Sequence, residues 1–278
     1  MRVFVAGATG ALGRALIRRL VEERHSVRAV APRPAGACAP PAVDADLCAH
    51  DLRELVRGCD AVVDLTTAPD TVTTRRLLDA SVACGVRRYV QRSFAMVYRD
   101  GGDRWLDEDA PLDETARRSV ACRPVIETEA MIRLIDPQAL AWTILRGGSF
   151  VGAGTRQDAL IDRLRSRGAV VAGDGSNYLS PLNVADMASA VAAALRHAPA
   201  GSTFNIVDEP LRYSDYIDAL ADLIGVTRPP RAAAKPLGES RRCTNSAART
   251  VLGWTPRHPI WPSRRAAGEL TSSSSGWT

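Results

Sequence analysis

The sequence predicts an α/β fold built on a doubly wound parallel sheet. Short apolar runs rich in β-branched residues alternate along the chain with segments of about ten to fifteen residues that carry apolar side chains at helical spacing. The first run is followed directly by a glycine-rich turn and then by a helix-like segment. Strands that alternate with helices form right-handed crossovers, so the strands become parallel and helices cover both faces of the sheet.

The expected strands of the first part are short and apolar without strict alternation, as buried parallel strands are. They cover residues 1–6, 27–32, 61–66, 87–93 and 141–148. The helices expected between them cover residues 15–24, 51–60, 74–86 and 125–135. This order fits a single sheet whose strands all run in the same direction.

The pattern loosens after Phe150. Helices are expected there at 158–168, 185–198 and 213–226, and a strand at 203–208. We therefore expect a core domain at residues 1–150 and a smaller substrate-side lobe at 151–270 that also contributes to the core. The serine-rich end, residues 271–278, has the composition of a disordered tail.

Composition argues against several classes of protein. No apolar run is long enough to span a bilayer, and the first ten residues do not resemble an export signal, so we expect a cytoplasmic protein that binds no membrane. The six cysteines form no C-x-x-C pair and the four histidines have no second ligand at metal spacing, so no metal site is expected. The net charge of +5 comes from arginines interleaved with acids, which is typical of solvated helix faces rather than of a nucleic-acid surface.

The turn after the first strand predicts a dinucleotide site of the Rossmann type. Its glycines follow G-x-x-G-x-x-G spacing, and they allow an unusual backbone angle, a close approach to a pyrophosphate and close packing of helix on strand. The N-terminus of the following helix then offers free N–H groups and a partial positive charge to the phosphates. We predict cofactor contacts at Gly7, Thr9, Gly10, Ala11, Leu12 and Gly13.

The end of the second strand indicates which dinucleotide binds. An acid there would bond the ribose of NAD, whereas the segment VRAVAPRP has no acid and offers Arg33 to a 2′-phosphate. NADP is therefore favoured, with NAD as the alternative. Asp46 and Leu47 are placed to meet the adenine. The carboxyl end of the strand at 61–66 adds Leu65, Thr66 and Thr67.

Segments along nearly the whole chain resemble one family. They are GATGALG at 7–13, DAVVDLT at 60–66, LLDASVACGVRRYVQRS at 77–93, VY at 97–98, PLDE at 111–114, TILRGGSFVGAG at 143–154, YLSPLNVADMASAVAAAL at 178–195, FNIVDEP at 204–210 and VLGWTP at 251–256. Together they resemble the extended and atypical short-chain dehydrogenase/reductases, the NAD(P)-dependent epimerase/dehydratase-like proteins. The resemblance implies this fold and NAD(P) binding, and it adds Gly148 and Phe150 to the expected cofactor contacts.

The resemblance also implies a catalytic tyrosine with a lysine four residues later, and the sequence lacks this pair. The only lysine is Lys235, and no tyrosine lies four residues before it. If Glu129 matches the glutamate of the family's helix, Ala121 and Val125 occupy the two places; if Glu127 does, Ser119 and Arg123 occupy them. The family's hydroxyl, four residues before the tyrosine of the V-Y pair, is replaced by Phe94.

Hydride transfer without a positioned acid is slower but not excluded, since such an acid contributes roughly 10²–10⁴-fold in rate. An acceptor that needs little protonation, such as a quinone-like or conjugated ring, would suit this site best. By position, the candidates for a replacement acid are Tyr98, Ser93 and Tyr178.

We therefore expect an atypical NAD(P)-binding reductase that acts on a small, specialised metabolite. Phe94 makes the pocket apolar and Trp105, Trp142 and Trp261 could add aromatic surface, which favours an apolar or aromatic substrate. A non-redox cyclase, isomerase or dehydratase and a non-catalytic NAD(P) sensor are the alternatives. An open cleft beside the cofactor would favour an enzyme and a blocked cleft a sensor. The sequence also leaves a homodimer open.

Overall fold

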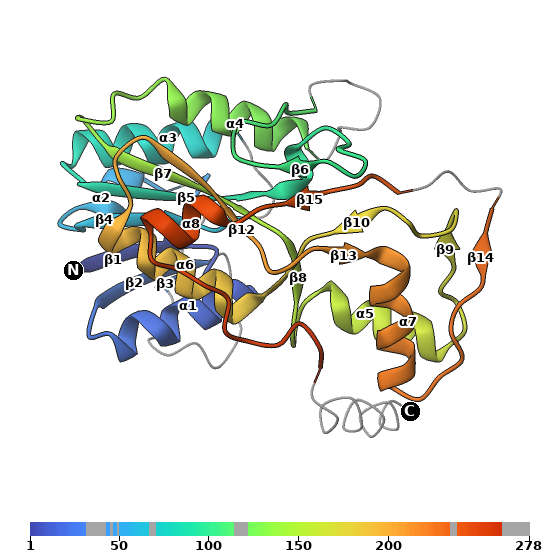
Figure 1. Cartoon of the computed structure of the whole chain (residues 1–278). Coiled ribbons are helices and arrows are strands. Elements are labelled where there is room, and N and C mark those ends of the chain that lie inside the picture. The colour runs from blue at the N-terminus through green and yellow to red at the C-terminus, as the bar shows by residue number, and fades with distance from the viewer. Residues whose placement is uncertain are drawn as a thin grey trace, which may run out of the picture.

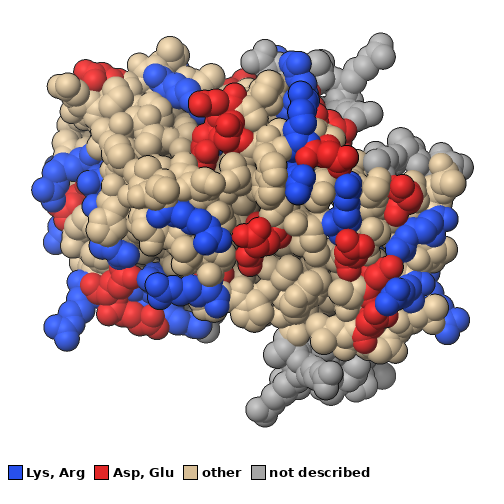
Figure 2. Space-filling model, in the orientation of Figure 1, with Lys and Arg blue, Asp and Glu red and all other residues tan. Residues whose placement is uncertain are grey.

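The structure is a computed structural model that describes residues 1–31, 43–44, 47–48, 50–66, 71–113, 122–233 and 238–262. The predicted positions Arg33, Asp46 and Thr67 lie outside these residues, as do Ser119, Ala121 and the expected tail. No helix in the described part is long and apolar enough to cross a lipid bilayer. On the face seen in Figure 2, basic and acidic side chains are interleaved over the surface.

The doubly wound parallel sheet is confirmed. Seven strands pair in the order β12-β7-β5-β4-β1-β2-β3, and every pairing is parallel. The strands are β1 (Arg2–Ala6), β2 (Ser26–Ala31), β3 (Val43–Asp44), β4 (Ala61–Asp64), β5 (Arg88–Phe94), β7 (Ala141–Gly147) and β12 (Ser202–Ile206). The chain reverses its order between β1 and β4, and ligands of such sheets bind outside the carboxyl ends of the strands at that point.

Helices cover both faces of the sheet (Figure 1). One face carries α1 (Ala11–Glu22), α6 (Val184–His197) and α8 (Ser246–Val251), whose apolar residues pack in one core with β1 and β4. The other face carries α2 (Leu52–Val56), α3 (Thr71–Ala83) and α4 (Arg123–Arg133). The second helix is shorter than predicted, because Gly58 adopts a positive φ of 72° and ends it.

The chain after Phe150 is divided between the sheet and a smaller lobe, seen at the right of Figure 1. Among the elements predicted there, β12 joins the sheet and α6 covers one of its faces. In contrast, α5 (Arg156–Arg165) and α7 (Tyr213–Leu223) pack on each other in the lobe. Short paired strands complete this region: β8 (Ser149–Val151) with β11 (Pro181–Asn183), β9 (Val171–Ala172) with β14 (Arg231–Ala232) and β10 (Tyr178–Leu179) with β13 (Leu211–Arg212). In addition, β15 (Arg242–Cys243) pairs with β6 (Trp105–Leu106) of the first part of the chain. The domain boundary at residue 150 remains a prediction.

Candidate functional site

The glycine turn between β1 and α1 has the geometry that the spacing predicts. Gly7 has a φ of 79°, which L side chains rarely adopt. A Cβ on Gly13 would lie 2.3 Å from the Gly7 carbonyl oxygen, so only glycine lets α1 pack this closely on the turn. A Cβ on Gly7 would lie 3.0 Å from the carbonyl carbon of Leu65. The turn is therefore packed against the carboxyl end of β4.

Packing inside the protein does not require a glycine at position 10, unlike at Gly7 and Gly13. A Cβ there would meet only the Gly7 carbonyl oxygen, at 3.8 Å, and its φ of −67° suits any residue. Gly10 is the N-cap of α1, and no side chain caps this helix in the described structure. In the described structure the N–H groups of Ala11 and Leu12 have no hydrogen-bond acceptor, and the Arg14 side chain folds back to the Thr9 carbonyl next to them. This cradle fits the diphosphate of a dinucleotide, which a Cβ at Gly10 would obstruct.

Other predicted cofactor contacts lie around this turn. The Thr9 carbonyl accepts a hydrogen bond from Arg14. Thr66 donates to the Asp64 carboxylate from its N–H at 3.0 Å and from its hydroxyl at 2.8 Å. Two residues are fixed mainly by packing. Leu47 is buried in the core beneath α2 and α3, and a Cβ on Gly148 would lie 2.3 Å from the Ser180 carbonyl oxygen.

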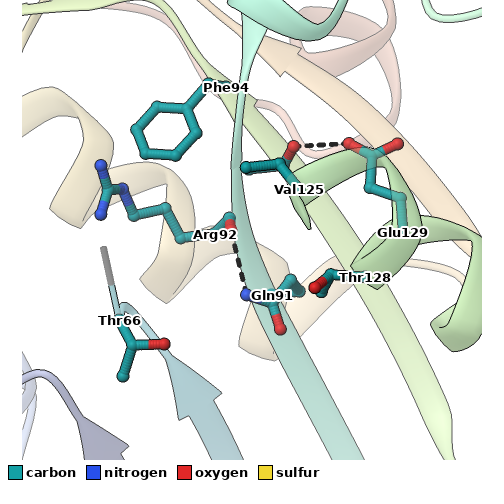
Figure 3. A pocket seen from close by; sticks show the side chains of 8 residues that line it. Thr66, Gln91, Arg92, Phe94, Val125, Thr128 and Glu129 are labelled. Carbon is teal, nitrogen blue, oxygen red and sulfur yellow. Dashed lines mark hydrogen bonds between the residues drawn. The ribbon is translucent and has the colours of Figure 1, made fainter. Parts of the chain in front are cut away.

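Arg92 on β5 is a cation that the sequence interpretation missed. Its guanidinium lies 4.0 Å from the ring centroid of Phe94 and 5.2 Å from that of Phe150, and Nη1 donates to the Leu65 carbonyl at 3.2 Å. Its buried Nε has no hydrogen-bond partner in the described structure. Burial lowers the pKa of Arg92 to about 10, against the opposing charge of Asp64. Figure 3 shows this side chain reaching from β5 toward the end of β4 beside Thr66.

Ser93 and Tyr98, two of the proposed catalytic residues, are locked in a buried network on the opposite face of β5. The Ser93 hydroxyl donates to Glu129 at 2.5 Å. Tyr98 is 0% exposed, receives a hydrogen bond from Arg146 at 2.7 Å and donates one to Asn205 at 2.7 Å. Burial raises the pKa of Tyr98 above its usual value, despite the neighbouring charge of Arg146. Their catalytic role remains a prediction, but this placement favours a structural one.

The network centres on the ion pair between Glu129 of α4 and Arg146 of β7. Arg146 donates to both carboxylate oxygens, at 3.1 Å from Nε and 2.7 Å from Nη2, and Arg133 adds a third bond at 2.9 Å. Burial alone would raise the pKa of Glu129, but the hydrogen bonds and charge of Arg146, helped by Ser93 and Arg133, hold that pKa below its ordinary value. The carboxylate is therefore ionised and fully partnered.

The two positions proposed for the missing lysine differ in environment. Val125 lines a small cavity of about 10 Å³ with Phe94 and Arg92, which is room for roughly one water molecule. In Figure 3 these residues surround the carboxyl end of β5. Arg123 instead lies on the surface of α4 and pairs with Glu127 at 2.8 Å. The side chain beside the cofactor region is thus the apolar Val125.

A larger cavity of about 440 Å³ lies next to this region, between the carboxyl edge of the sheet and the smaller lobe. Tyr178, the third proposed catalytic residue, lines it together with Tyr213. None of the predicted tryptophans lines it: Trp142 is in the core, Trp105 is half exposed and Trp261 stacks on Tyr216. The other described lining residues are Ala95, Met96, Gly148, Ser149, Ala172, Asn177, Leu179, Ser180, Gly238, Glu239 and Arg241. This volume suits a small molecule.

Comparison with known proteins agrees with this site. A family model described as NAD(P)H-binding matches residues 7–198. A 3-diazoavenalumate denitrifying reductase from a Streptomyces species is 32% identical over 304 residues, covering 94% of this chain and 98% of that protein. A dTDP-6-deoxy-L-talose 4-dehydrogenase (NAD(P)(+)) from Kitasatospora kifunensis is 26% identical over 317 residues, covering 99% and 96% respectively.

Solved structures show the same fold. The UDP-glucuronic acid 4-epimerase from Bacillus cereus, in complex with UDP-glucuronic acid and NAD, has a TM-score of 0.81 at 19% identity, covering 97% of this chain and 100% of that one. The turn geometry and the family match together support NAD(P) binding. The chain belongs to the NAD(P)H-binding family, and it has the fold of the Bacillus cereus epimerase.

Proposed function

We propose that this protein is an NAD(P)H-dependent reductase whose substrate is a small, specialised aromatic metabolite that needs no acid from the protein. One observation carries the proposal. The dinucleotide turn keeps its geometry, while Phe94 and Val125 occupy places that a hydroxyl and a lysine would hold under the family resemblance, and neither side chain can transfer a proton. A site that keeps its dinucleotide turn and lacks the tyrosine–lysine pair suits an acceptor that is already strongly electrophilic.

The chain's own residues would hold the cofactor at two places. The N–H groups at the start of α1 would bind the diphosphate beside Gly10, where a Cβ would meet only the Gly7 carbonyl oxygen. Arg92 directs a buried, incompletely bonded guanidinium at the same edge of the sheet, next to the end of β4. NADP is the preferred form in this proposal, because the sequence after β2 offers Arg33 and no acid.

The Streptomyces relative suggests the class of acceptor, since its name describes removal of nitrogen from a diazo compound. The bound reduced cofactor supplies a hydride. When hydrogen replaces a diazonium group on a ring, one C–H bond forms and one C–N bond breaks, and the electron pair of that bond leaves with N₂. Because the leaving group departs as a neutral gas, no side chain has to protonate it. We propose a diazo-substituted ring as the substrate of this chain.

The cavity favours this enzyme over a non-catalytic sensor, because about 440 Å³ is open beside the sheet edge. Met96 lines it near the carboxyl end of β5 and Tyr178 lines it from the lobe, while Phe94 lines the small cavity. An apolar wall of this kind excludes water from the reacting carbon and limits competing hydrolysis. Tyr178 is the one proposed acid that reaches the cavity, and it remains the candidate donor for a substrate that does need a proton.

The test measures whether a hydride is transferred from NADPH to the substrate. The protein is first titrated with NADPH and NADH by calorimetry, then mixed with a hydroxyaryl diazonium carboxylate and NADPH deuterated at the transferring position. We expect one NADPH consumed for each N₂ released, with deuterium on the ring carbon that carried the diazo group. Tight NADPH binding without its consumption, for any acceptor that is turned over, would contradict the proposal and favour the non-redox alternative.

A further inference from the structure

The large cavity is lined by two tyrosines whose hydroxyls have no partner inside the protein. These are Tyr178 of β10 and Tyr213 at the start of α7. Neither hydroxyl makes a hydrogen bond within the described residues, and neither is among the polar side-chain atoms that are both buried and unpartnered there, so both are accessible. The hydroxyls of Tyr89, Tyr98 and Tyr216 all take part in hydrogen bonds inside the protein.

The ring of Tyr178 is held in place by two arginines. The guanidinium of Arg212 lies 4.1 Å from the centroid of this ring, and that of Arg242 lies 4.6 Å from it. Both arginines are anchored at Asp103, because Arg212 pairs with its carboxylate at 2.9 Å and Arg242 donates to its carbonyl at 3.0 Å. A hydroxyl on a ring that is already fixed loses little freedom when it bonds a ligand, which favours binding.

The charges around Tyr178 compensate one another, and this bears on the kind of ligand. The guanidiniums are those of Arg212, Arg241 and Arg242, and the carboxylates are those of Asp100, Asp103, Asp174 and Glu239. A charged group of a ligand gains little net attraction from such a mixture. An uncharged oxygen that accepts a hydrogen bond is instead the natural partner of an unpartnered phenol hydroxyl.

The cavity extends from this tyrosine to the edge of the sheet. Ala95 and Met96 line it just after β5, and Gly148 lines it just after β7. The ligands of doubly wound sheets bind at this carboxyl edge. A substituted aromatic ring fits a volume of about 440 Å³, so one molecule can meet both the sheet edge and the lobe.

We propose that Tyr178 donates a hydrogen bond to an uncharged oxygen on the substrate's ring, and that it thereby selects rings with a quinone-like carbonyl. Tyr178 keeps its proton and is a specificity-determining residue. This inference deepens the function proposed above and rests on it for the identity of the reacting ring. The binding of a ring oxygen in this cavity can be tested without that reaction.

The ring oxygen has a part in the proposed reaction. When a ring carbonyl is conjugated with the diazo group, hydride addition forms one C–H bond and breaks the C–N bond, whose electron pair leaves with N₂. The neutral gas does not carry away the negative charge of the hydride, so this charge ends on the oxygen as the ring becomes a phenolate. A donor aimed at that oxygen stabilises the charge as it develops.

Binding without turnover tests the hydrogen bond. The protein is saturated with oxidised NADP, which cannot donate a hydride, and is titrated calorimetrically with α-tetralone, an uncharged aryl ketone, and with tetralin, which has the same rings and no oxygen. Tyr178→Phe should weaken binding of the ketone by about threefold to tenfold, as expected for one neutral hydrogen bond, and leave binding of tetralin unchanged.

Infrared spectra report the same bond directly. In isotope-edited spectra of carbonyl-labelled α-tetralone, the carbonyl band of the bound ketone should lie at lower wavenumber in the natural protein than in Tyr178→Phe, since a donated hydrogen bond weakens the C=O bond. If Tyr178→Phe does not fold, the band in the natural protein is compared with that of the ketone in hexane, where no donor is present.

Two control variants assign the effect to one hydroxyl. Arg228→Gln removes an exposed arginine paired with Asp222 and should leave both affinities unchanged. Tyr213→Phe removes the other hydroxyl of the cavity and should leave the carbonyl band where it is in the natural protein. The proposal is overturned if neither compound binds, if Tyr178→Phe affects both alike, or if the band does not move. Absence of deuterium transfer, with this hydrogen bond intact, would refute the proposed reaction alone.

Discussion

At the carboxyl edge of the sheet, each face has a buried arginine, and the two arginines differ in their hydrogen-bond partners. Arg146 on β7 points to the face covered by α4, where Glu129, Tyr98 and the Glu108 carbonyl accept its hydrogen bonds. Arg92 on β5, one register position away, points to the face covered by α1 and α6. It meets two aromatic rings and one carbonyl, and its Nε has no partner in the described chain.

We infer from this difference that the polar groups on the α4 face stabilise the fold, whereas those on the α1 face bind a ligand. On the α4 face the hydroxyls of Ser93 and Tyr98 both donate their proton inside the protein, so neither has an O–H left to donate to a substrate. On the α1 face the N–H groups beside Gly10 and the guanidinium of Arg92 retain unused donors. Burial of an unmatched donor is unfavourable, and its presence at a sheet edge that binds dinucleotides indicates a binding role.

The largest expected effect is the stability difference between the two arginines. Arg146→Met should lower the free energy of unfolding by about 3–5 kcal/mol, because it leaves the carboxylate of Glu129 buried with a weaker partner. Arg92→Met should change it by less than about 1 kcal/mol, since no carboxylate loses a hydrogen bond and Asp64 keeps its bonds from Thr66. Urea unfolding of both variants measures this. Equal losses would show that the two faces do not differ as described.

A smaller effect is expected at the turn. Gly10→Ala should weaken NADPH binding by about tenfold or more, because a Cβ there stands between the helix N–H groups and the diphosphate. The unfolding free energy should change by less than about 1 kcal/mol, as the N-cap tolerates this backbone conformation. Calorimetric titration together with thermal unfolding separates the two quantities. An unchanged affinity would remove the turn from the cofactor site.

The smallest expected effect is on the unfolding free energy at acidic pH. The pKa of Glu129 is lower in the folded protein than the ordinary value of 4.5, so its contribution to stability is present above that value and is lost as the pH falls through the lowered pKa. The unfolding free energy of the natural protein should therefore fall more steeply below pH 4.5 than that of Glu129→Gln. Urea titrations at several pH values measure both slopes, and equal slopes would mean that Glu129 is not held ionised by Arg146.

The sequence predicts the turn and the sheet well because both depend on local patterns. Glycine spacing and short apolar runs are properties of neighbouring residues, and β1, β2 and β5 lie within a residue or two of the predicted ranges. The helix α2 is shorter than its predicted range because a glycine with positive φ ends it, although the residues on both sides have helical periodicity. The cofactor cradle at Gly10 is local in the same sense.

The ion-pair network depends on contacts that a pattern does not contain. Glu129 is buried on α4 together with Val125, Thr128 and Ile132, and a carboxylate among uncharged residues at this spacing is a signal that could have been noticed. Its partner on β7 lies 17 residues later, on another element. Because the arginines are interleaved with acids in the sequence, we interpreted them as solvent-exposed. Arg92 and Arg146 nevertheless lie on buried strands, where the alternation of side chains between the two faces, and not the density of charge, decides exposure.

The wall behind the cavity has a consequence for how the molecule is put together. Arg242 and Cys243 form β15, which pairs with Trp105 and Leu106 of β6, far back along the chain. All seven strands of the sheet are complete by Ile206, yet one face of the sheet is covered only once α8 has formed, because Ala248, Leu252 and Trp254 are buried in the same core as β1 and β4. A chain cut just before Glu239 would therefore lose part of the cover of the sheet together with the wall of the cavity. Both halves of the molecule thus depend on residues made late in synthesis, and neither is complete before Trp254 has been added.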